Sequence, residues 1–287
     1  MAKPYWLKKR VAFGTTMQNV LAVLRSGRLH TVCEEARCPN CPDCFSQGTA
    51  TFLILGDRCT RNCRFCAVTH EAPLPTDHRE PGNVAEAVRN LGLHYVVITS
   101  VTRDDLPDGG AAHFAETIEC IRNESPGAAI EVLIPDFGGS EKALETIISA
   151  KPDVIGHNLE TAPRLYPAVR PQADYQTSLT LLKTAAAMNP SIPTKSGLML
   201  GIGENADEVR QVLHDMRKAG CSLLWLGQYL QPDRTRFPVE RYVHPDEFEA
   251  WREEASALGF RGVASGPFVR SSYHAGELYE GLHQTAV

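Results

Sequence analysis

Six apolar or β-branched runs, separated by helix-compatible segments, are the feature that most constrains the fold. The runs cover residues 50–56, 95–100, 129–135, 153–158, 194–200 and 222–228. Segments compatible with helices lie between most of them, at 83–90, 111–123, 141–150, 176–188 and 207–218. Strands that alternate with helices of this length predict βαβ units and a parallel sheet. Runs that are continuously apolar predict strands buried on both faces.

Two α/β architectures are compatible with this alternation. Six units are too few for an eight-fold barrel, which needs about 250 residues, so we predict a partial (β/α)6 barrel. A doubly wound open sheet fits the alternation as well, and periodicity alone does not separate the two. We expect an N-terminal extension at 1–48, the barrel at 49–235 and a C-terminal extension at 236–287. Helices are predicted in the extensions, at 16–26 and 246–258.

Composition excludes several classes of protein. The chain has 287 residues, 43% hydrophobic and 22% charged, which excludes a disordered or collagen-like chain. Its 29 basic and 34 acidic residues give a net charge of -5, which does not favour broad nucleic-acid binding. No apolar run approaches the ~20 residues that cross a bilayer. No apolar segment follows the basic start of the sequence, so we expect no secretory signal and a cytoplasmic protein.

Seven of the nine cysteines lie between Cys33 and Cys66, which indicates metal binding or catalysis in a reducing compartment. The most specific pattern is C-x3-C-x2-C, formed by Cys59, Cys63 and Cys66 directly after the first predicted strand. Barrel active sites lie at such carboxyl ends of strands. Three thiolates on one loop can hold three irons of a four-iron cluster and leave the fourth iron open. The alternative is a structural zinc knuckle that lacks its fourth ligand.

This triplet, with an aromatic residue before its last cysteine, resembles the signature of the radical S-adenosylmethionine (SAM) enzymes. In that superfamily the open iron binds the amino and carboxylate groups of SAM, and electron transfer cleaves SAM to a 5′-deoxyadenosyl radical. The resemblance also implies a partial six-stranded barrel of the radical SAM type. It assigns Cys59, Cys63 and Cys66 as the catalytic cluster ligands.

A second cysteine pattern narrows the resemblance. Cys33, Cys38 and Cys44 have the spacing C-x4-C-x5-C. Together with the triplet, this resembles the lipoyl synthase family, in which that spacing carries an auxiliary four-iron cluster. The resemblance extends over nearly the whole chain, through residues 99–110, 157–161, 195–201 and 270–275.

Three other cysteines stand outside these two patterns. Cys41 departs from the family spacing and creates a second possible set, C-x2-C-x2-C, with Cys38 and Cys44. We favour the interpretation that Cys41 is an unligated thiol near the cluster. Cys120 and Cys221 are predicted to be core residues.

The resemblance implies a serine ligand that would close the auxiliary site from the RSSY motif at 270–273. Either Ser271 or Ser272 fits, and we take Ser272, next to Tyr273, as the better match. The alternative is ordinary capping or turn chemistry for these hydroxyl groups.

Polar residues near the carboxyl ends of the strands are candidates for SAM contacts. The resemblance implies the following set: Thr102, Arg103, Asp104, Asn158, Glu160, Lys195 and Ser196. The alternatives are a solvated acidic turn after residue 101 and a core ion pair of Lys195 with Glu131 or Glu160. His157 fits a hydrogen-bonded core role at least as well as a functional one. Residues 201–204 predict a tight turn that brings the backbone close to SAM.

The family resemblance implies an enzyme, a sulfurtransferase with two [4Fe-4S] clusters and SAM as cosubstrate. It would insert two sulfur atoms at C6 and C8 of a protein-bound octanoyl-lysine, with the auxiliary cluster as sacrificial sulfur donor. The implied partners are octanoylated lipoyl-carrier domains (2-oxoacid dehydrogenase E2 subunits and the glycine cleavage H protein), an electron donor such as ferredoxin or flavodoxin, and an iron–sulfur carrier protein. We expect no nucleic-acid and no membrane partner.

Other hypotheses remain open at this point. A related one is another radical SAM sulfur-insertion enzyme, either biotin-synthase-like or methylthio-transferring. A hypothesis of another class is a non-catalytic iron–sulfur or zinc module. Basic residues of the leader form either a docking face for acidic carrier domains or a solvated charge run, and these are Lys8, Lys9, Arg10, Arg25 and Arg28.

Overall fold

A computed structural model gives the fold and describes residues 2–9 and 14–284. The chain divides into two compact units. The first unit comprises Met1–Lys9, Asn62–Cys66 and Gly156–Val287, and the second comprises Arg10–Arg61 and Ala67–Ile155. The C-x3-C-x2-C loop is therefore divided between them, and each unit is described by itself.

The sheet of the second unit contains β1 (His30–Thr31), β2 (Thr51–Ile54), β3 (Tyr95–Ser100), β4 (Ala129–Leu133) and β5 (Val154–Gly156). Its strands follow chain order, and the pairs β2–β3 and β3–β4 are parallel, whereas β1 is antiparallel to β2. Phe52 is in register with Ile98, which is in register with Val132, and all three side chains are fully buried. The continuous apolar runs thus form strands covered on both faces.

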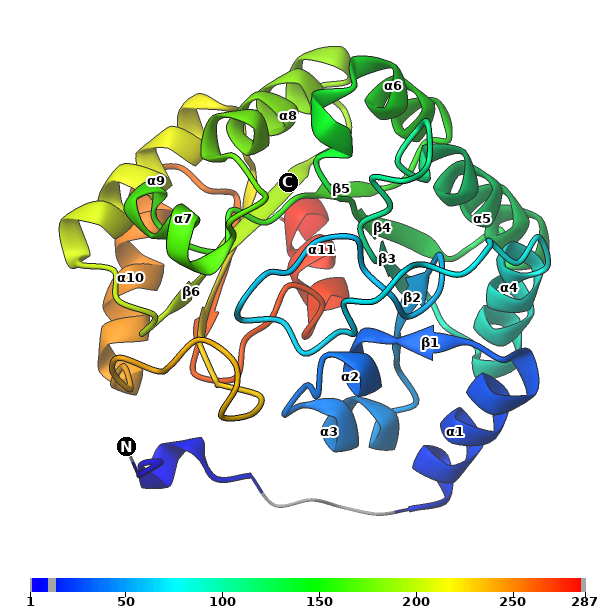
Figure 1. Cartoon of the computed structure of the whole chain (residues 1–287), viewed down its shortest axis with the longest axis horizontal. Helices are drawn as coiled ribbons and strands as arrows, with labels where there is room; N and C mark the ends of the chain where they lie inside the picture. Colours follow the sequence, from blue (N-terminus) through cyan, green and yellow to red (C-terminus); the bar gives the residue numbers. More distant parts are fainter. Residues whose placement is uncertain (1, 10–13, 285–287) are drawn as a thin grey trace. The chain divides into compact units, whose positions relative to one another are not determined.

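Helices of the second unit are α1 (Thr15–Gly27), α2 (Val32–Glu35), α3 (Cys41–Ser46), α4 (Glu80–Leu91), α5 (Ala111–Glu124) and α6 (Glu141–Ser149), with a short 3-10 helix η2 (Phe137–Gly139). Helices α4, α5 and α6 lie outside strands β2 to β4 (Figure 1). Local chemistry sets their ends: the Ser140 hydroxyl accepts a hydrogen bond from the Ala143 N–H at the start of α6. Gly92, at φ 63°, ends α4 in the left-handed conformation.

The first unit contains the parallel strands β6 (Thr194–Leu200), β7 (Leu223–Gln228) and β8 (Gly262–Gly266). Its helices are η1 (Tyr5–Leu7), η3 (Pro163–Leu165), α7 (Tyr166–Val169), α8 (Tyr175–Met188), α9 (Ala206–Lys218), α10 (Pro245–Ala257) and α11 (Ala275–Gln284). Asn205 and Glu208 form a capping box at the start of α9. The buried face of α9 packs with β6 and β7 in one core, to which Val212, Leu198 and Leu224 belong.

The six strands and the seven helices predicted from the sequence are all present, with ends that differ by up to three residues. Two further strands accompany them: β1 lies in the leader, where we expected little strand character, and β8 lies in the C-terminal extension. In both units the strand order follows the chain, without the reversal of order that defines a doubly wound sheet. Of the two architectures considered, the strand order therefore supports the partial barrel and excludes the doubly wound open sheet. The three-part division at residues 48 and 235 stays a prediction.

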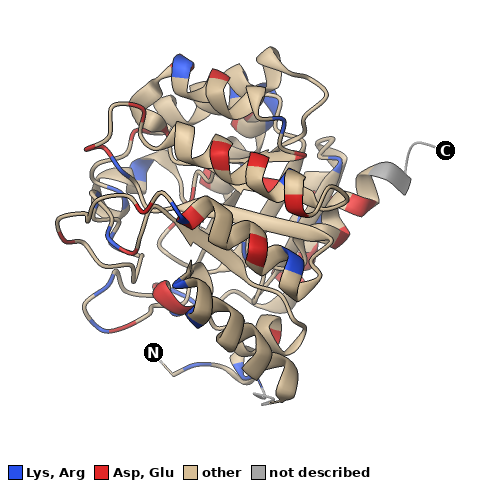
Figure 2. Ribbon diagram, turned by 90° about the vertical axis from the view of Figure 1, so that its right-hand side faces the viewer, with Lys and Arg blue, Asp and Glu red and all other residues tan. Residues whose placement is uncertain are grey.

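Surface properties agree with the sequence analysis. Within residues 2–9 and 14–284, no helix is both long and apolar enough to span a bilayer. Acidic and basic residues are intermixed along the outer helices in the view of Figure 2. Such a mixed surface matches the small net charge of -5.

Candidate active site

The loop that carries Cys59 leaves β2 through a strained residue. Leu55 has a φ of 67°, a conformation that costs a residue with a β-carbon roughly 1–2 kcal/mol. Its N–H donates to Glu80 Oε2 at 2.7 Å, and its carbonyl oxygen accepts from Arg103 Nη1 at 3.3 Å. Glu80 Oε2 also contacts His113 Nε2 at 2.7 Å. Two buried charged side chains therefore hold the strained backbone at the start of the cysteine loop.

Arg61 joins the cysteine loop to the loops that follow β3 and β4. Its Nε and Nη2 atoms donate to the two carboxylate oxygens of Asp104, both at 2.8 Å. Its Nη1 and Nη2 atoms donate to Asp136, at 2.6 and 2.7 Å. Burial opposes the charge on Arg61, but the bonds to Asp104 and Asp136 outweigh it and raise the guanidinium pKa. One side chain thus ties together three loops at the carboxyl ends of neighbouring strands.

The predicted SAM contacts of the second unit are engaged within the protein. The Thr102 N–H donates to Cys59 Sγ at 3.3 Å, and the Thr102 carbonyl oxygen accepts from the Thr60 N–H at 3.0 Å. Arg103 is 3% exposed and donates to both carboxylate oxygens of Asp105 at 2.8 Å. These bonds lower the pKa of Asp105. Thr102, Arg103 and the Arg61-bound Asp104 therefore shape the cysteine loop, and their contact with SAM stays a prediction.

In the first unit, residues 62–66 lie against the segment that follows α7. The Asn62 N–H donates to Gln172 Oε1 at 2.6 Å, and the Arg64 N–H donates to the Val169 carbonyl oxygen at 2.8 Å. Phe65, between Arg64 and Cys66, packs against the buried cluster that contains Val169. The backbone of this half of the loop is therefore fixed on both sides of Cys63.

Arg170 is directed at Cys63 from the end of α7. Its Nη1 atom donates to the carbonyl oxygens of Asn158 and Leu159, at 3.0 and 3.1 Å, and to the Tyr166 hydroxyl at 3.1 Å. Burial opposes its charge, but Tyr166 and a hydrogen bond to Cys63 outweigh burial and raise the Arg170 pKa. A buried cation next to a cysteine favours the thiolate form, the form that binds iron.

The segment 157–161 pairs with β6. The Glu160 N–H donates to the Gly197 carbonyl oxygen at 3.0 Å, and the Glu160 carbonyl oxygen accepts from the Met199 N–H at 2.9 Å. The Trp225 Nε1 atom donates to Asn158 Oδ1 at 2.8 Å. A β-carbon on Gly197 would lie 2.4 Å from the Trp225 ring, so glycine is required beneath this indole. Packing and hydrogen bonds together fix the Asn158 side chain.

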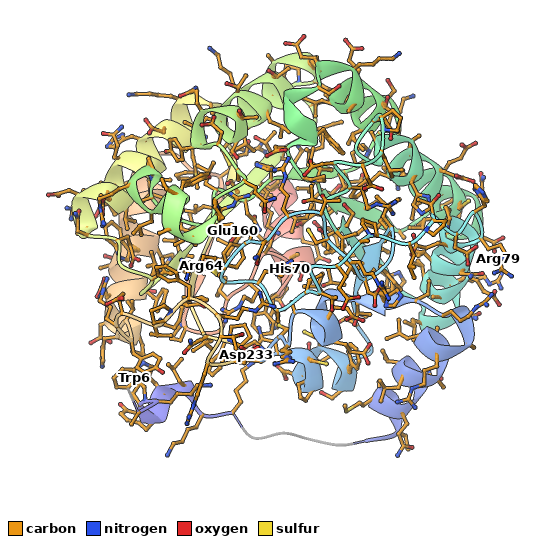
Figure 3. All side chains as sticks on the ribbon, viewed as in Figure 1. Trp6, Arg64, His70, Arg79, Glu160 and Asp233 are labelled. Atoms are coloured by element: carbon orange, nitrogen blue, oxygen red, sulfur yellow. The ribbon has the colours of Figure 1, made fainter. Side chains whose placement is uncertain are left out.

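Glu160, labelled in Figure 3, combines backbone strain with an unusual electrostatic environment. Its φ is 66°, which is rare for a residue other than glycine and is typical of functional positions. Burial raises the pKa of its carboxyl group, while Arg170, the Asn158 amide and Arg270 act in the opposite direction. A buried carboxyl group with an amide and two cations in its surroundings is a suitable polar anchor for a ligand.

The other predicted residues of the first unit are buried in and beside β6. Lys195 is 1% exposed and Ser196 is fully buried. Ser196 Oγ accepts a hydrogen bond from the Leu159 N–H at 3.3 Å, which is a structural contact. His157 Nε2 lies 3.0 Å from Ser178 Oγ, and both side chains are buried. The hydrogen-bonded core role considered for His157 is confirmed.

The turn at residues 201–204 is tight, as predicted, with Gly201 at φ 88°. Its N–H groups point at the carboxylate of Glu204: those of Gly201, Ile202 and Gly203 donate to it at 2.7, 3.0 and 3.1 Å. The turn therefore binds the side-chain carboxylate of Glu204, which belongs to the turn itself. These three donors are already occupied before any SAM approaches.

The auxiliary cysteines lie together in and around α2 and α3 of the second unit. Cys33 is buried, whereas Cys38, Cys41 and Cys44 are half-buried. Burial raises the pKa of the Cys33 thiol, and the three neighbouring thiols raise it further. Burial, then Glu34 and Cys38, raise the pKa of Cys41 to about 11. Iron binds the thiolate form of cysteine, so cluster binding would release protons from these thiols.

The two candidate serines differ in their surroundings. The Ser271 hydroxyl is buried and has no hydrogen-bond partner among the residues that the structure describes, and its residue is 8% exposed. Ser272 is half-buried, and its carbonyl oxygen accepts from the Ala275 N–H at 3.4 Å. A buried hydroxyl group without a partner calls for an explanation, and an absent ligand is one.

One leader base packs inward on the first unit. Lys9 Nζ lies 4.7 Å from the ring centroids of both Phe268 and Tyr273, and 3.4 Å from the Tyr273 hydroxyl oxygen. Lys9 is therefore engaged with the segment around the RSSY motif, a contact that the docking hypothesis did not anticipate. Arg10 lies outside the described residues. The docking role of the remaining bases stays a prediction.

Cys120 and Cys221 were both predicted to be core residues. Cys221 is fully buried, with its thiol 3.3 Å from the Leu223 carbonyl oxygen. Cys120 is half-buried on α5, so the prediction is wrong for this residue. It lies between the buried residues Ile118 and Ile121 in the sequence of α5.

No three His, Cys, Asp or Glu side chains of residues 2–9 and 14–284 are arranged as ligands of one metal ion. Cluster binding is therefore judged on the chemistry of the donors. Cys59 already accepts a backbone N–H, and Cys63 faces Arg170. Hydrogen bonds to sulfur and nearby charge are the protein features that tune iron–sulfur clusters.

Known proteins resemble this chain closely. Residues 53–216, more than half of the chain, match the Radical SAM superfamily, and residues 1–38 match the N-terminal domain of lipoyl synthase. The lipoyl synthase of Caldicellulosiruptor saccharolyticus is 54% identical over 275 residues, which cover 96% of each chain. The lipoyl synthase of Proteus mirabilis is 54% identical over 284 residues, covering 98% of this chain and 88% of that one. The chain belongs to the lipoyl synthase family.

Two solved structures share the fold at low sequence identity. The FeFe-hydrogenase maturase of Carboxydothermus hydrogenoformans has a TM-score of 0.61 at 18% identity, covering 80% of this chain and 56% of that one. Methylornithine synthase has a TM-score of 0.55 at 14% identity, covering 88% and 75%. The predicted fold class, a partial barrel of the radical SAM type, is confirmed.

Membership of the lipoyl synthase family makes this chain a radical SAM enzyme that uses a [4Fe-4S] cluster and SAM. The donor set fits the cluster, since Cys59, Cys63 and Cys66 supply three thiols on one loop and leave one iron without a protein ligand. Sequence reasoning identified these cysteines but missed Arg61 and Arg170. The available signal was an arginine inside the cysteine loop with aspartates after the next two strands.

Proposed function

We propose that this enzyme inserts two sulfur atoms, at C6 and C8, into an octanoyl chain carried on a lysine of a carrier protein. The two cysteine sets, C-x4-C-x5-C and C-x3-C-x2-C, in a chain 54% identical to lipoyl synthases, carry the proposal. When bound, the cluster on the triplet and SAM supply hydrogen abstraction from an unactivated carbon, and an auxiliary cluster supplies sulfur. The residues around the two cysteine sets then have separate tasks.

Cys59, Cys63 and Cys66 hold the first cluster. Arg61 keeps its half of the loop at a fixed distance from β3 and β4 through two bidentate ion pairs. Arg170 keeps the Cys63 thiolate in place in the first unit. Reactions of this kind depend on holding reacting atoms within a fraction of an ångström, so a loop fixed at several points is the expected device.

Asn158 and Glu160 are proposed to contact SAM. Both residues are held before any ligand binds, Asn158 through its side chain by Trp225 and Glu160 through its backbone by the pairing with β6. Their amide and carboxylate groups are suited to the hydroxyl and amino groups that SAM presents. Lys195 and Ser196 are proposed to contribute from β6, where both are buried.

Cys33, Cys38 and Cys44 hold the auxiliary cluster, and a serine of the RSSY motif completes it. We retain Ser272 as the first candidate, but the buried and unpartnered hydroxyl group of Ser271 supports the alternative. Separate alanine variants of the two serines distinguish them. The ligating serine is the one whose loss reduces auxiliary-cluster iron while leaving the cluster on the triplet in place.

The carrier domains of 2-oxoacid dehydrogenase E2 subunits and of the glycine cleavage H protein are the proposed protein substrates. A ferredoxin or flavodoxin is the proposed reductant, and an iron–sulfur carrier protein is proposed to rebuild the consumed cluster. We propose a cytoplasmic location, where such reductants and carriers are found.

Mass spectrometry of an octanoylated carrier domain tests the function. The reconstituted protein is incubated anaerobically with SAM, dithionite and the carrier, without added sulfide. A gain of two sulfur atoms is expected, with a loss of two hydrogen atoms once the dithiol product is oxidised to the disulfide. If SAM is cleaved to 5′-deoxyadenosine but the octanoyl chain keeps its mass, the radical SAM assignment stands and the proposed substrate is wrong.

A further inference from the structure

A tight turn joins Cys38 to Cys41 in the second unit. The Cys38 carbonyl oxygen accepts from the Cys41 N–H at 3.1 Å, and Asn40 has φ -92° and ψ -4°. With Pro39 in its second position, this is a type I turn, which keeps its end Cα atoms within about 7 Å. A disulfide requires Cα atoms roughly 4.4–6.8 Å apart. The backbone therefore already holds these two cysteines at a separation that a disulfide can span.

The surroundings of the cysteines favour this pair over the others. Cys38 and Cys41 are half-buried and accessible to a reagent, whereas Cys33 is 5% exposed. Cys33 lies in α2, outside the turn that joins Cys38 and Cys41. Cys44 lies close to Cys41 in the first turn of α3, so it competes with Cys38 as the disulfide partner of Cys41.

Cys41 also has no assigned task. It stands outside the C-x4-C-x5-C spacing, so the cluster-ligand set is complete without it. We propose that Cys41 forms a disulfide with Cys38 when the cysteine segment holds no cluster, with a low-molecular-weight disulfide such as oxidised glutathione as the oxidant.

The exchange balances in two steps. The thiolate of one cysteine attacks a sulfur atom of oxidised glutathione, whose S–S bond breaks to release one glutathione thiol. The thiolate of the other cysteine attacks the protein sulfur of this mixed disulfide and releases a second glutathione thiol. The protein loses two electrons and two thiol protons, and two molecules of glutathione carry them away.

This disulfide gives the enzyme a protected cluster-free state, a consequence that rests on the proposed function. A sacrificial cluster leaves its cysteines without iron after turnover. Pairing with Cys41 keeps Cys38 at an oxidation level that thiols reverse, whereas further oxidation of a free thiol to sulfinic acid does not reverse in this way. Cluster assembly then requires reduction of the disulfide first.

Peptide mapping of the full chain tests the pairing directly. The chain is freed of iron with a chelator, incubated with oxidised glutathione in mildly alkaline buffer, alkylated and digested with trypsin. Cleavage after Arg37 and Arg58 places Cys38, Cys41 and Cys44 in one peptide and leaves Cys33 in the preceding one, 29–37. The expected product is peptide 38–58, lighter by two hydrogens and alkylated once, at Cys44.

Variants control the assignment. Cys41→Ser should lose the internal link, whereas Cys120→Ser, which removes another half-buried thiol, should behave as the wild type. The proposal is overturned if Cys41→Ser forms an internal link at the wild-type rate or if the link joins Cys41 to Cys44. It is also overturned if peptide 29–37 becomes cross-linked or if the wild type stops at glutathione adducts.

Iron content separates this proposal from the proposed function. Reconstitution of the oxidised wild type should bind about half the iron of the reduced protein, since one of two four-iron sites is blocked. Dithiothreitol should restore the difference, and Cys41→Ser should show none. A disulfide between Cys38 and Cys41 without any change in iron binding would support the pairing and contradict the assignment of Cys38 as a cluster ligand.

Discussion

Arg61 should be among the most costly residues to replace in the second unit. Its guanidinium group makes four charge-assisted hydrogen bonds, two to Asp104 and two to Asp136. Asp136 is 4% exposed, so Arg61→Met leaves a buried carboxylate without its cation. Breaking a buried ion pair in this way costs roughly 3–5 kcal/mol. Asp136 keeps the N–H of Gly138, so we expect the lower end of that range, about 3 kcal/mol.

The substitution Arg61→Lys separates charge from geometry. Lysine keeps the positive charge but replaces two planar forks with one ammonium group. We expect a loss of about 2 kcal/mol, since charged hydrogen bonds contribute roughly 1.5–3 kcal/mol each and lysine can retain some of them. Arg58→Lys is the matched control on the same loop, because Arg58 is a third exposed and its ion pair with Glu71 should contribute under about 1 kcal/mol.

Guanidinium unfolding followed by circular dichroism measures these differences. Hydrogen exchange of peptides that contain Asp104 and Asp136 reports on the loops themselves, and protection there should fall in Arg61→Met. The double variant Arg61→Met with Asp136→Asn should recover at least 1 kcal/mol, because the buried charge is gone. A loss below about 0.5 kcal/mol in Arg61→Met, or no recovery in the double variant, would refute the reasoning.

Three further predictions concern the first unit. Asn205→Ala removes the capping box of α9 and should destabilise the protein by about 1 kcal/mol in thermal unfolding, with Asn205→Ser as a near-neutral control. Arg164 lowers the pKa of Glu208, so the ionised Glu208 stabilises the folded protein fully above the unfolded pKa of about 4.3, and this stabilisation is lost as the pH falls further. Glu208→Gln should therefore reduce the dependence of the unfolding free energy on pH in that range. Gly197→Ala forces its β-carbon into the Trp225 ring and should weaken SAM binding, measured by equilibrium dialysis, at least tenfold; unchanged binding would contradict the positioning of Asn158 by this indole.

Much of the fold could be predicted because its elements are long and periodic. The run at 194–200 became a strand with every residue buried, and the segment at 207–218 became a helix with a buried apolar face. Most of the elements that were missed are short and owe their existence to particular contacts, although α11 (10 residues) was missed as well. α2 begins where the Thr31 side chain accepts the Glu34 N–H, and β1 is two residues paired to β2. No hydrophobic period reaches significance over two to six residues.

The candidate site could be predicted only in part, for a related reason. Spacing identifies cysteines because the ligands of one cluster lie close together along the chain. The pairing of Arg61 with Asp136 spans 75 residues, and the approach of Arg170 to Cys63 spans over a hundred. Only the order of the strands brings such residues to one place. Composition gave no indication of these contacts.

The hydrogen bonds of two residues expected to contact SAM indicate a structural role for them instead. Arg103 and Asp104 use their charged groups on Asp105 and Arg61, and Leu55 depends on Arg103 for its carbonyl partner. In an acid–base enzyme, charged residues at the ends of barrel strands face the substrate because they move protons. The radical reaction that we propose, at an unactivated carbon, offers those charges no proton to move, so the same positions are available to fix the cysteine loop. The ion pairs fit the proposed chemistry, because that reaction needs an immobile cluster loop at the end of β2.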